Sequence, residues 1–162
     1  MGKNKNRERA RELLEMLLEG RSPDGEFDDL AGIPPKVLGA LGEELAAWYL
    51  DERGYTIVER NYRCPEGEAD IVAFDVDSEE IVLVEVKTRR EHIGIDSAYP
   101  EEAVTPKKQQ RYRRIAYCYA AEHFPVPAVR FDVIAVGIEP ESTARRGTIR
   151  HICRAFDWEA DQ

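Results

Sequence analysis

The chain has 162 residues, 43% hydrophobic and 34% charged, which is enough for one domain with a substantial core and is ordinary for a globular protein. Its net charge of −9 argues against bulk, non-specific nucleic-acid binding, which requires positive charge. The sequence contains neither an apolar run near the roughly 18 residues of a membrane span nor the apolar core of a signal peptide. Three cysteines, Cys64, Cys118 and Cys153, favour reduced thiols over a disulfide framework. We therefore expect a cytoplasmic protein with no membrane partner.

The N-terminal segment, residues 1–36, is predicted to form one helix followed by a linker. Between residues 7 and 19, four leucines fall on one stripe of an amphipathic helix: Leu13, Leu14, Leu17 and Leu18. We expect this helix to dock on its own domain or to fray, and a dedicated site for a protein partner is the alternative. Turn residues over positions 21–35 predict a linker.

Residues 37–53 predict the next helix, and residues 55–63 predict a strand. Two prolines before the helix suit its entry, and Gly54 suits its end. Glu43 and Glu44 are expected early in this helix, where glutamates commonly complement the helix dipole. We keep that interpretation for Glu44.

Two apolar runs, residues 69–74 and 81–87, predict a central hairpin. Both are rich in β-branched side chains. The acidic segment between them, residues 75–80, is expected to be a solvated turn. Three charges interrupt the runs: Asp70, Glu85 and Lys87. A charge in a buried strand is costly unless it is paired or binds a metal, so these residues predict a site. Lys87 shares a face with Glu85 and could hold an attacking water or offset the charge of a phosphate.

The hairpin register follows from the length of its loop. If residues 76–79 form a four-residue loop, Asp75 lies opposite Glu80, and counting back along both strands places Asp70 opposite Glu85. Like charges that face each other across two strands repel. A divalent cation between the two carboxylates would remove the repulsion, and Mg²⁺ prefers such oxygen ligands.

Basic residues are concentrated after the hairpin. Residues 88–104 predict a polar loop that could close over a substrate, with His92 as a candidate contact. Thr105 and Pro106 suit the N-cap and first turn of the following helix. Residues 107–114 read KKQQRYRR, which in an acidic chain is the pattern of phosphate contacts, with a solvated helix face as the alternative. The candidate DNA contacts are Arg89, Arg90, Lys107, Lys108, Gln109, Arg111 and Arg114.

The C-terminal part is predicted to add two strands, at residues 129–136 and 148–155, before an acidic tail at residues 157–162. Arg130 and Asp132 share one face of the first strand and are expected to be structural partners. His151 and Cys153 could supply half of a zinc site, although their spacing is not the usual one. The order of elements predicts an α/β fold with a mixed sheet of about five strands flanked by helices, plus the extra N-terminal helix.

The hairpin also carries a resemblance. Gly67-Glu68-Ala69-Asp70 followed by Glu85-Val86-Lys87 resembles the D…ExK signature of the PD-(D/E)XK nucleases. The wider pattern, over about residues 38–156, is similar to the YraN-like family of bacterial proteins, whose fold is similar to Holliday-junction resolvases. The supporting segments are Leu41-Gly42-Glu43, Tyr49-Leu50, Gly54-Tyr55, Asn61-Tyr62-Arg63, Thr88-Arg89, Arg130-Phe131-Asp132-Val133-Ile134, His151-Ile152 and Ala155-Phe156.

The resemblance implies a restriction-endonuclease-like core over residues 37–156. It implies that Asp70, Glu85 and Glu43 bind Mg²⁺, for which Mn²⁺ substitutes, together with the carbonyl of Val86. By the same resemblance Lys87 is catalytic, and the helix that begins near residue 106 often lends a Gln or Lys to the site, which makes Lys107 and Gln109 candidates. The N-terminal helix is a departure, because the family usually begins close to the Gly42-Glu43 helix.

The expected function is therefore that of a Mg²⁺-dependent endodeoxyribonuclease that hydrolyses phosphodiester bonds, with branched or recombination intermediates as the substrates that the resemblance suggests. Junction-cleaving relatives also suggest a homodimer. Two alternatives stay open: a non-cleaving DNA-binding or DNA-processing accessory module with the same fold, and a protein-interaction subunit that acts through the N-terminal helix.

Overall fold

The computed structural model describes residues 2–19, 32–90, 104–138 and 147–158. Three helices and five strands follow one another along these residues: α1 (Gly2–Glu19), α2 (Pro35–Glu52), β1 (Thr56–Cys64), β2 (Gly67–Asp75), β3 (Glu80–Arg90), α3 (Pro106–Glu122), β4 (Val129–Ile138) and β5 (Gly147–Ile152). His92, most of the predicted linker and most of the acidic tail lie outside the described residues.

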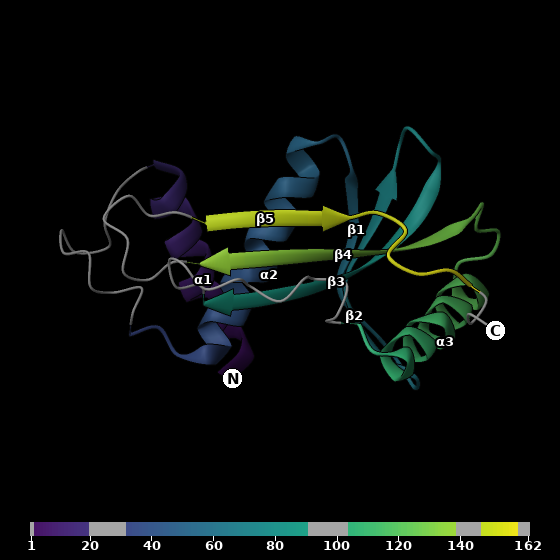
Figure 1. The fold of residues 1–162 in the computed structure, drawn as a ribbon, viewed down its shortest axis with the longest axis horizontal. Helices are drawn as coiled ribbons and strands as arrows, with labels where there is room; N and C mark the ends of the chain where they lie inside the picture. Colours follow the sequence, from purple (N-terminus) through teal and green to yellow (C-terminus); the bar gives the residue numbers. More distant parts are fainter. Residues whose placement is uncertain (1, 20–31, 91–103, 139–146, 159–162) are drawn as a thin grey trace.

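The five strands form one mixed sheet in the order β1-β2-β3-β4-β5 (Figure 1). Only β3 and β4 pair in parallel within this sheet, while the other neighbours are antiparallel. The parallel pair requires a crossover connection, and α3 lies in it. The predicted α/β fold is thus confirmed. Several predicted boundaries were wrong: β3 continues to Arg90 instead of ending at residue 87, β4 continues to Ile138, and β5 ends at Ile152 instead of residue 155.

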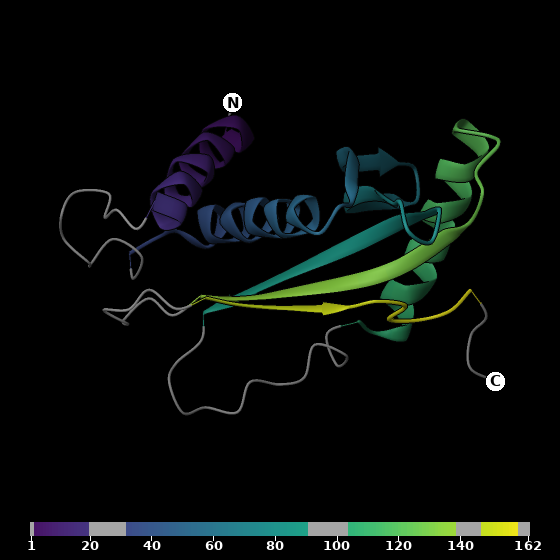
Figure 2. The ribbon, with the colours of Figure 1, turned by 90° about the horizontal axis from the view of Figure 1, so that it is seen from above.

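The helices cover opposite faces of the sheet, because side chains alternate along each strand. Ile71 and Val84 belong to a core under α1 and α2, whereas Val72 and Leu83 belong to a second core under α3. Figure 2 shows α1 lying over α2, so this side of the sheet carries two helical layers.

The N-terminal helix α1 packs on its own domain. Ala10 and Leu13 are buried in the core that it shares with α2. Leu14 and Leu17 pack against the same core and are partly buried, whereas Leu18, the last leucine of the stripe, is 50% exposed. Arg11 also forms an ion pair with Glu44 of α2, at 3.5 Å.

The predicted role of Glu44 in the helix dipole was wrong. Because α2 begins at Pro35, Glu44 lies in its third turn, where the dipole has little effect. Its side chain is buried and pairs with Arg60 of β1 at 3.4 Å as well as with Arg11. Glu44 therefore joins α1, α2 and the sheet.

Arg130 of β4 holds the opposite end of the sheet together. Its guanidinium donates to both carboxylate oxygens of Asp132, at 2.9 and 3.0 Å, which confirms the expected pair. It also binds Asp75 at 2.8 Å and Glu80 at 3.3 Å. The prediction of a solvated acidic turn between β2 and β3 was therefore wrong for Asp75 and Glu80, and right for the exposed residues 76–79.

The potential zinc ligands of the last strand belong to the same network. Ligand atoms of Asp132, His151 and Cys153 lie within 4.8 Å of one another. However, Asp132 already accepts hydrogen bonds from Arg130, from the backbone N–H of Arg154 and from His151 at 2.7 Å. The cluster thus acts as a polar connection between β4 and β5.

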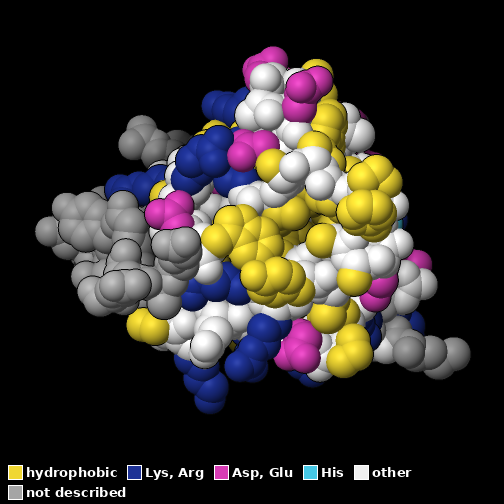
Figure 3. Space-filling view, turned by 90° about the vertical axis from the view of Figure 1, so that its right-hand side faces the viewer, with side chains coloured by type: hydrophobic (Ala, Val, Ile, Leu, Met, Phe, Trp, Pro, Cys, Tyr) yellow, Lys and Arg dark blue, Asp and Glu magenta, His cyan; other side chains and the backbone are white. Residues whose placement is uncertain are grey.

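Figure 3 shows hydrophobic side chains gathered on the α3 end of the molecule. Large exposed apolar residues near this end include Tyr117 of α3, Phe124 just after it and Trp158, and the rings of Tyr117 and Trp158 are 5.2 Å apart. Among the described residues, no helix is both long and apolar enough to cross a membrane.

Gly42 sets the distance between α2 and the sheet. A Cβ atom at this position would lie 1.7 Å from Thr88 Oγ1 and 2.7 Å from Thr88 Cβ, so only glycine permits the contact. Gly39, one turn earlier, has nothing within 4 Å of an added Cβ.

We predict that Gly42→Ala lowers stability and that Gly39→Ala does not. The added methyl group must push α2 from β3, and overpacking of this kind costs about 1–3 kcal/mol. At Gly39 the same change removes a flexible residue from a helix and gains up to about 1 kcal/mol. Urea unfolding of both variants measures the difference. Equal stability of the two variants would contradict the close contact with Thr88.

Candidate functional site

The sheet forks at the predicted site. Strands β2 and β3 pair from Asp75–Glu80 to Ile71–Val84, which confirms the predicted register over these residues. Beyond this point β2 continues to Gly67 beside β1, while β3 continues to Arg90 beside β4. Asp70 and Glu85 occupy the next position of the register, where the two strands part.

At the fork, the side chain of Asp70 takes the place of a backbone hydrogen-bond partner for β3. Its Oδ2 accepts a hydrogen bond from the Val86 backbone N–H at 2.8 Å. Burial, and next the negative charge of Glu85, raise the pKa of Asp70 to about 8. The predicted repulsion between the two carboxylates is thus reflected in the metal-free site.

Glu85 is buried and is surrounded by donors. Lys108 of α3 donates to its Oε1, and Lys87 Nζ lies 3.5 Å from the same oxygen. The hydroxyl of Tyr112 donates to Oε2 at 2.5 Å. Glu85 therefore has positive charge on one oxygen and a buried hydroxyl on the other.

The two lysines have opposite pKa shifts. Burial and the nearby positive charge of Lys108 lower the pKa of Lys87. Burial alone would also lower the pKa of Lys108, but its hydrogen bond to Glu85 outweighs that effect and raises it. Lys87 is consequently the more readily deprotonated of the pair, and Lys108 is the more firmly charged.

Sequence reasoning placed Lys108 among the DNA contacts and gave Tyr112 no role at Glu85. Both side chains point from α3 to Glu85 instead. Their spacing of four residues puts them on one face of the helix, followed by buried Ile115 and Tyr119 on the same side. This periodicity was the available signal that Lys108 faces inward.

Glu43 reaches the fork from α2. It is half-buried, and its Oε2 accepts a hydrogen bond from the side-chain amide of Asn61 at 3.3 Å. Burial raises the pKa of Glu43, and its charge in turn contributes to the raised pKa of Asp70. Glu43 thus lies close enough to Asp70 to influence it electrostatically.

Asn61 and Arg7 are site residues that sequence reasoning missed. Asn61 has a φ of 52°, a left-handed conformation that asparagine tolerates better than most residues. Its amide oxygen accepts a hydrogen bond from Arg7 of α1, which fixes the amide nitrogen toward Glu43. The left-handed backbone at Asn61 could not be read from the strand pattern.

The other predicted DNA contacts separate into two groups. Arg89, Lys107, Arg111 and Arg114 are exposed. Arg90 donates to the carbonyl of Ile33, and the Gln109 amide donates to the carbonyl of Val104 at 3.2 Å. The structure therefore gives Arg90 and Gln109 local structural partners and brings Lys108, rather than Lys107 or Gln109, to the site.

The donor set suits a small, hard cation. Asp70, Glu85 and Glu43 supply carboxylate oxygens around the fork, and Mg²⁺ is usually bound by one or two carboxylates while it keeps several waters. The fold holds the like charges of Asp70 and Glu85 close together, and the raised pKa of Asp70 reflects their repulsion. A bound cation would neutralise these charges.

Comparison with known proteins identifies relatives of the chain. A family model described as "Uncharacterised protein family UPF0102" matches residues 42–136. A UPF0102 protein of Caldanaerobacter subterraneus is 40% identical over 122 residues, which cover 75% of this chain and 95% of that protein. A UPF0102 protein of Nocardia farcinica is 44% identical over 122 residues, 75% of this chain and 90% of that protein. One of Syntrophus aciditrophicus is 48% identical over 105 residues, 64% of this chain and 78% of that protein.

Asp70→Asn should stabilise the metal-free protein, because the amide oxygen can still accept from Val86 N–H while one of two facing charges is removed. The carboxyl titrates near 3.8 when unfolded and near 8 when folded, so the folded state binds more protons between these values. The parent therefore loses stability as pH rises through that interval. In thermal melts with chelator, the advantage of Asp70→Asn should grow from about pH 5 to pH 8 and then level off.

Magnesium should stabilise the parent protein more than Asp70→Asn, the opposite order to that expected with chelator. Millimolar Mg²⁺ should raise the melting temperature of the parent by mass action and change that of Asp70→Asn little. Asp77→Asn, in the exposed β2–β3 turn, is the matched control and should respond to Mg²⁺ as the parent does. Equal Mg²⁺ shifts in parent and Asp70→Asn would contradict a metal site at the fork.

Proposed function

We propose that this protein, which belongs to the UPF0102 (YraN) family of PD-(D/E)XK nuclease-like proteins, is a metal-dependent DNA endonuclease. The observation that carries the proposal is the meeting of Asp70 and Glu85 at the fork, with Lys87 and Lys108 beside them. A buried carboxylate, a half-buried one and two lysines are the groups needed to bind a cation and to hold a phosphodiester against an attacking water.

Asp70, Glu85 and Glu43 would hold the divalent cation, which supplies a Lewis acid for the phosphate and a water of lowered pKa. The two lysines of the site would then have different roles. Lys87 would position the attacking water by donating a hydrogen bond to its oxygen. Lys108, which stays charged on Glu85, would offset the negative charge that develops on the phosphate oxygens.

Exposed basic residues would guide DNA into the site. Lys107, Arg111 and Arg114 lie on the exposed side of α3, and Arg89 is exposed on β3 beside the catalytic residues. Such side chains bind backbone phosphates and fix the position of the duplex without reading its sequence. In a chain with net charge −9, this local placement would supply the attraction that the whole molecule lacks.

We expect the purified protein to nick branched or linear DNA only with Mg²⁺ or Mn²⁺. Asp70→Asn and Glu85→Gln should abolish cleavage because they remove metal ligands, and Lys87→Ala should slow it by about 10²-fold or more. Glu79→Gln in the exposed turn is the control and should cleave normally. Cleavage retained in all three site variants would refute the site. DNA binding without cleavage under any metal would favour the accessory module.

The role of α3 in DNA binding is tested by salt dependence. Replacing Lys107, Arg111 and Arg114 by Gln should weaken DNA binding and reduce the slope of log affinity against log salt by about one for each phosphate that is no longer neutralised. Arg113→Gln on the same helix is the control, because Arg113 donates to the carbonyl of Asp157 at 2.8 Å. If the triple variant keeps the parental slope, the DNA path does not follow α3.

A further inference from the structure

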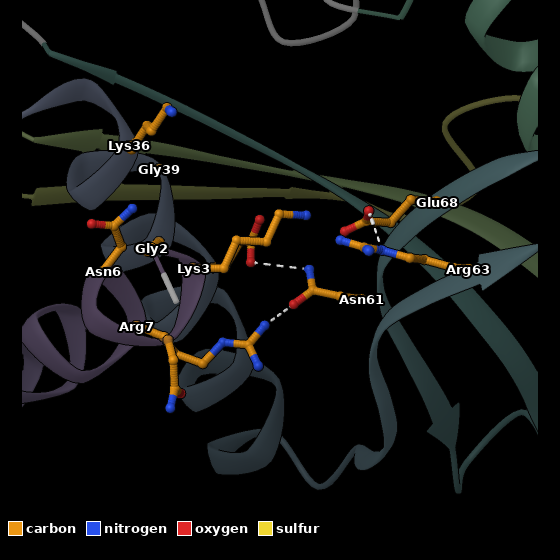
Figure 4. A pocket seen from close by; sticks show the side chains of 12 residues that line it. Gly2, Lys3, Asn6, Arg7, Lys36, Gly39, Asn61, Arg63 and Glu68 are labelled. Atoms are coloured by element: carbon orange, nitrogen blue, oxygen red, sulfur yellow. Dashed lines mark hydrogen bonds and ion pairs between the residues drawn. The ribbon is translucent and has the colours of Figure 1, made fainter.

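A cavity of about 1070 Å³ lies beside Glu43 and is open between α1, α2 and the β1–β2 arm of the sheet (Figure 4). We call it the α1 pocket. It is lined by Gly2, Lys3, Asn4, Asn6, Arg7, Lys36, Gly39, Ala40, Glu43, Asn61, Arg63 and Glu68. Its volume is at the upper end of the roughly 300–1,000 Å³ that ligand pockets typically occupy.

The α1 pocket concentrates positive charge in an acidic protein. The charged side chains of its lining are Lys3, Arg7, Lys36, Arg63, Glu43 and Glu68. Arg63 and Glu68 pair with each other at 2.9 Å and cancel. Lys3, Arg7 and Lys36 then stand against Glu43 alone. A concave surface lined by an excess of one sign focuses its potential, so this pocket should attract a polyanion.

The remaining lining fits a sugar–phosphate backbone better than a small apolar ligand. Small-molecule pockets are lined mainly by hydrophobic and aromatic side chains. Among the described residues that line the α1 pocket, none is aromatic and Ala40 is the only hydrophobic one; Gly2 and Gly39 leave room for close approach. Lysine, arginine and asparagine side chains, which dominate this lining, are those that commonly contact phosphates and sugars.

The α1 pocket is connected to the fork by a chain of side chains. Arg7 donates to the Asn61 carbonyl oxygen, and the Asn61 amide nitrogen donates to Glu43 Oε2 at 3.3 Å. Figure 4 shows the side chains of Arg7 and Asn61 pointing toward each other and joined by a hydrogen bond, with Arg63 and Glu68 on the β1–β2 side. Because Glu43 belongs to both the pocket and the proposed metal site, a strand bound in one would continue into the other.

We propose that the α1 pocket binds the sugar–phosphate backbone of the nucleic-acid strand next to the cleaved phosphodiester, an assignment that rests on the proposed nuclease function. Lys3 and Lys36 bind backbone phosphates, and Arg7 joins the bound strand to Glu43 through Asn61. The family model begins at residue 42, so α1 lies outside it. Lys3, Arg7 and Lys36 therefore lie outside the matched residues, while Glu43 and Asn61 lie within them.

The test compares two lysines on the same helix. Lys3 lines the pocket, whereas Lys5 is exposed and lies outside its lining. The full-length variants are Lys3→Gln/Lys36→Gln, Lys3→Arg/Lys36→Arg and Lys5→Gln. Binding of a fluorescent branched DNA is measured with chelator over a range of salt concentrations, and single-turnover cleavage is measured with Mg²⁺. Thermal melts check that each variant is folded.

We expect Lys3→Gln/Lys36→Gln to reduce the salt slope by about two, because two phosphates are no longer neutralised. The arginine variant should bind as the parent does, and so should Lys5→Gln. If the parent protein cleaves DNA but Lys3→Gln/Lys36→Gln binds DNA as Lys5→Gln does, the α1 pocket is not a binding subsite, while the proposed nuclease function still stands. If the parent protein binds DNA without cleaving it, and only Lys3→Gln/Lys36→Gln binds more weakly, the α1 pocket stands as a binding subsite and the nuclease function is refuted. No measurable binding by the parent would overturn both.

Discussion

The site depends on a change of hydrogen-bond partners in the sheet. Up to Ile71 and Val84, β2 and β3 satisfy each other's backbone groups; beyond them, each strand is held only by its outer neighbour. The Val86 N–H at this point would lack a strand partner, and the Asp70 carboxylate accepts its hydrogen bond. A buried backbone donor without a partner is costly, so the structure that opens the sheet also fixes a carboxylate at the opening. In a continuous sheet, Asp70 and Glu85 would face each other under α3 with no space between the strands for a ligand to enter from α2.

Two glycines allow the helices to approach the fork from opposite faces. Gly42 lets α2 lie directly against Thr88 of β3, which brings the neighbouring Glu43 toward Asp70. Gly67 has a φ of 147° and stands next to Arg111 and Ile115 of α3, so a side chain there would meet strain and crowding together. These close approaches give a physical reason why the resemblance includes Gly42-Glu43 and Gly67-Glu68.

The sequence was sufficient for those features that depend on local periodicity. The strict two-residue period and the four-residue loop determined the β2–β3 register, and Thr105 caps α3 through its hydrogen bond from Lys108 N–H as expected. The face of α3 that meets the sheet was misjudged, although the periodicity of the helix was present in the sequence. KKQQRYRR contains several lysines and arginines, and only the packing of Tyr112 and Ile115 turns Lys108, rather than Lys107, toward Glu85. Asp70 and Glu85 occupy the position where β2 and β3 part, as the counted register placed them, and the assignment of a metal to them stays a prediction.

Long-range ion pairs were equally inaccessible to the sequence. Arg130 binds Asp75 and Glu80, which precede it by 55 and 50 positions in the chain. The acidic turn was therefore predicted to be solvated, although these two residues tie it to β4. Asn61 is a related case, since its strand pattern gave no sign of the left-handed backbone that aims its amide at Glu43. Both depend on contacts that form only when the two ends of the sheet are in place.

The distribution of charge explains how an acidic chain can present a site to a polyanion. Glu44, Asp75 and Glu80 are neutralised by arginines within the fold, so their charges are not directed at a ligand. The carboxylates at the fork are different, because a phosphate brought within about 4 Å of one unneutralised carboxylate would meet a repulsion of about 4 kcal/mol near a protein surface. Lys108 and Lys87 beside Glu85 reduce that repulsion from within the site, and a bound divalent cation would remove the rest. A phosphodiester placed at the fork itself therefore depends on cations there, whereas the exposed basic residues of α3 and the α1 pocket hold the flanking backbone away from that repulsion.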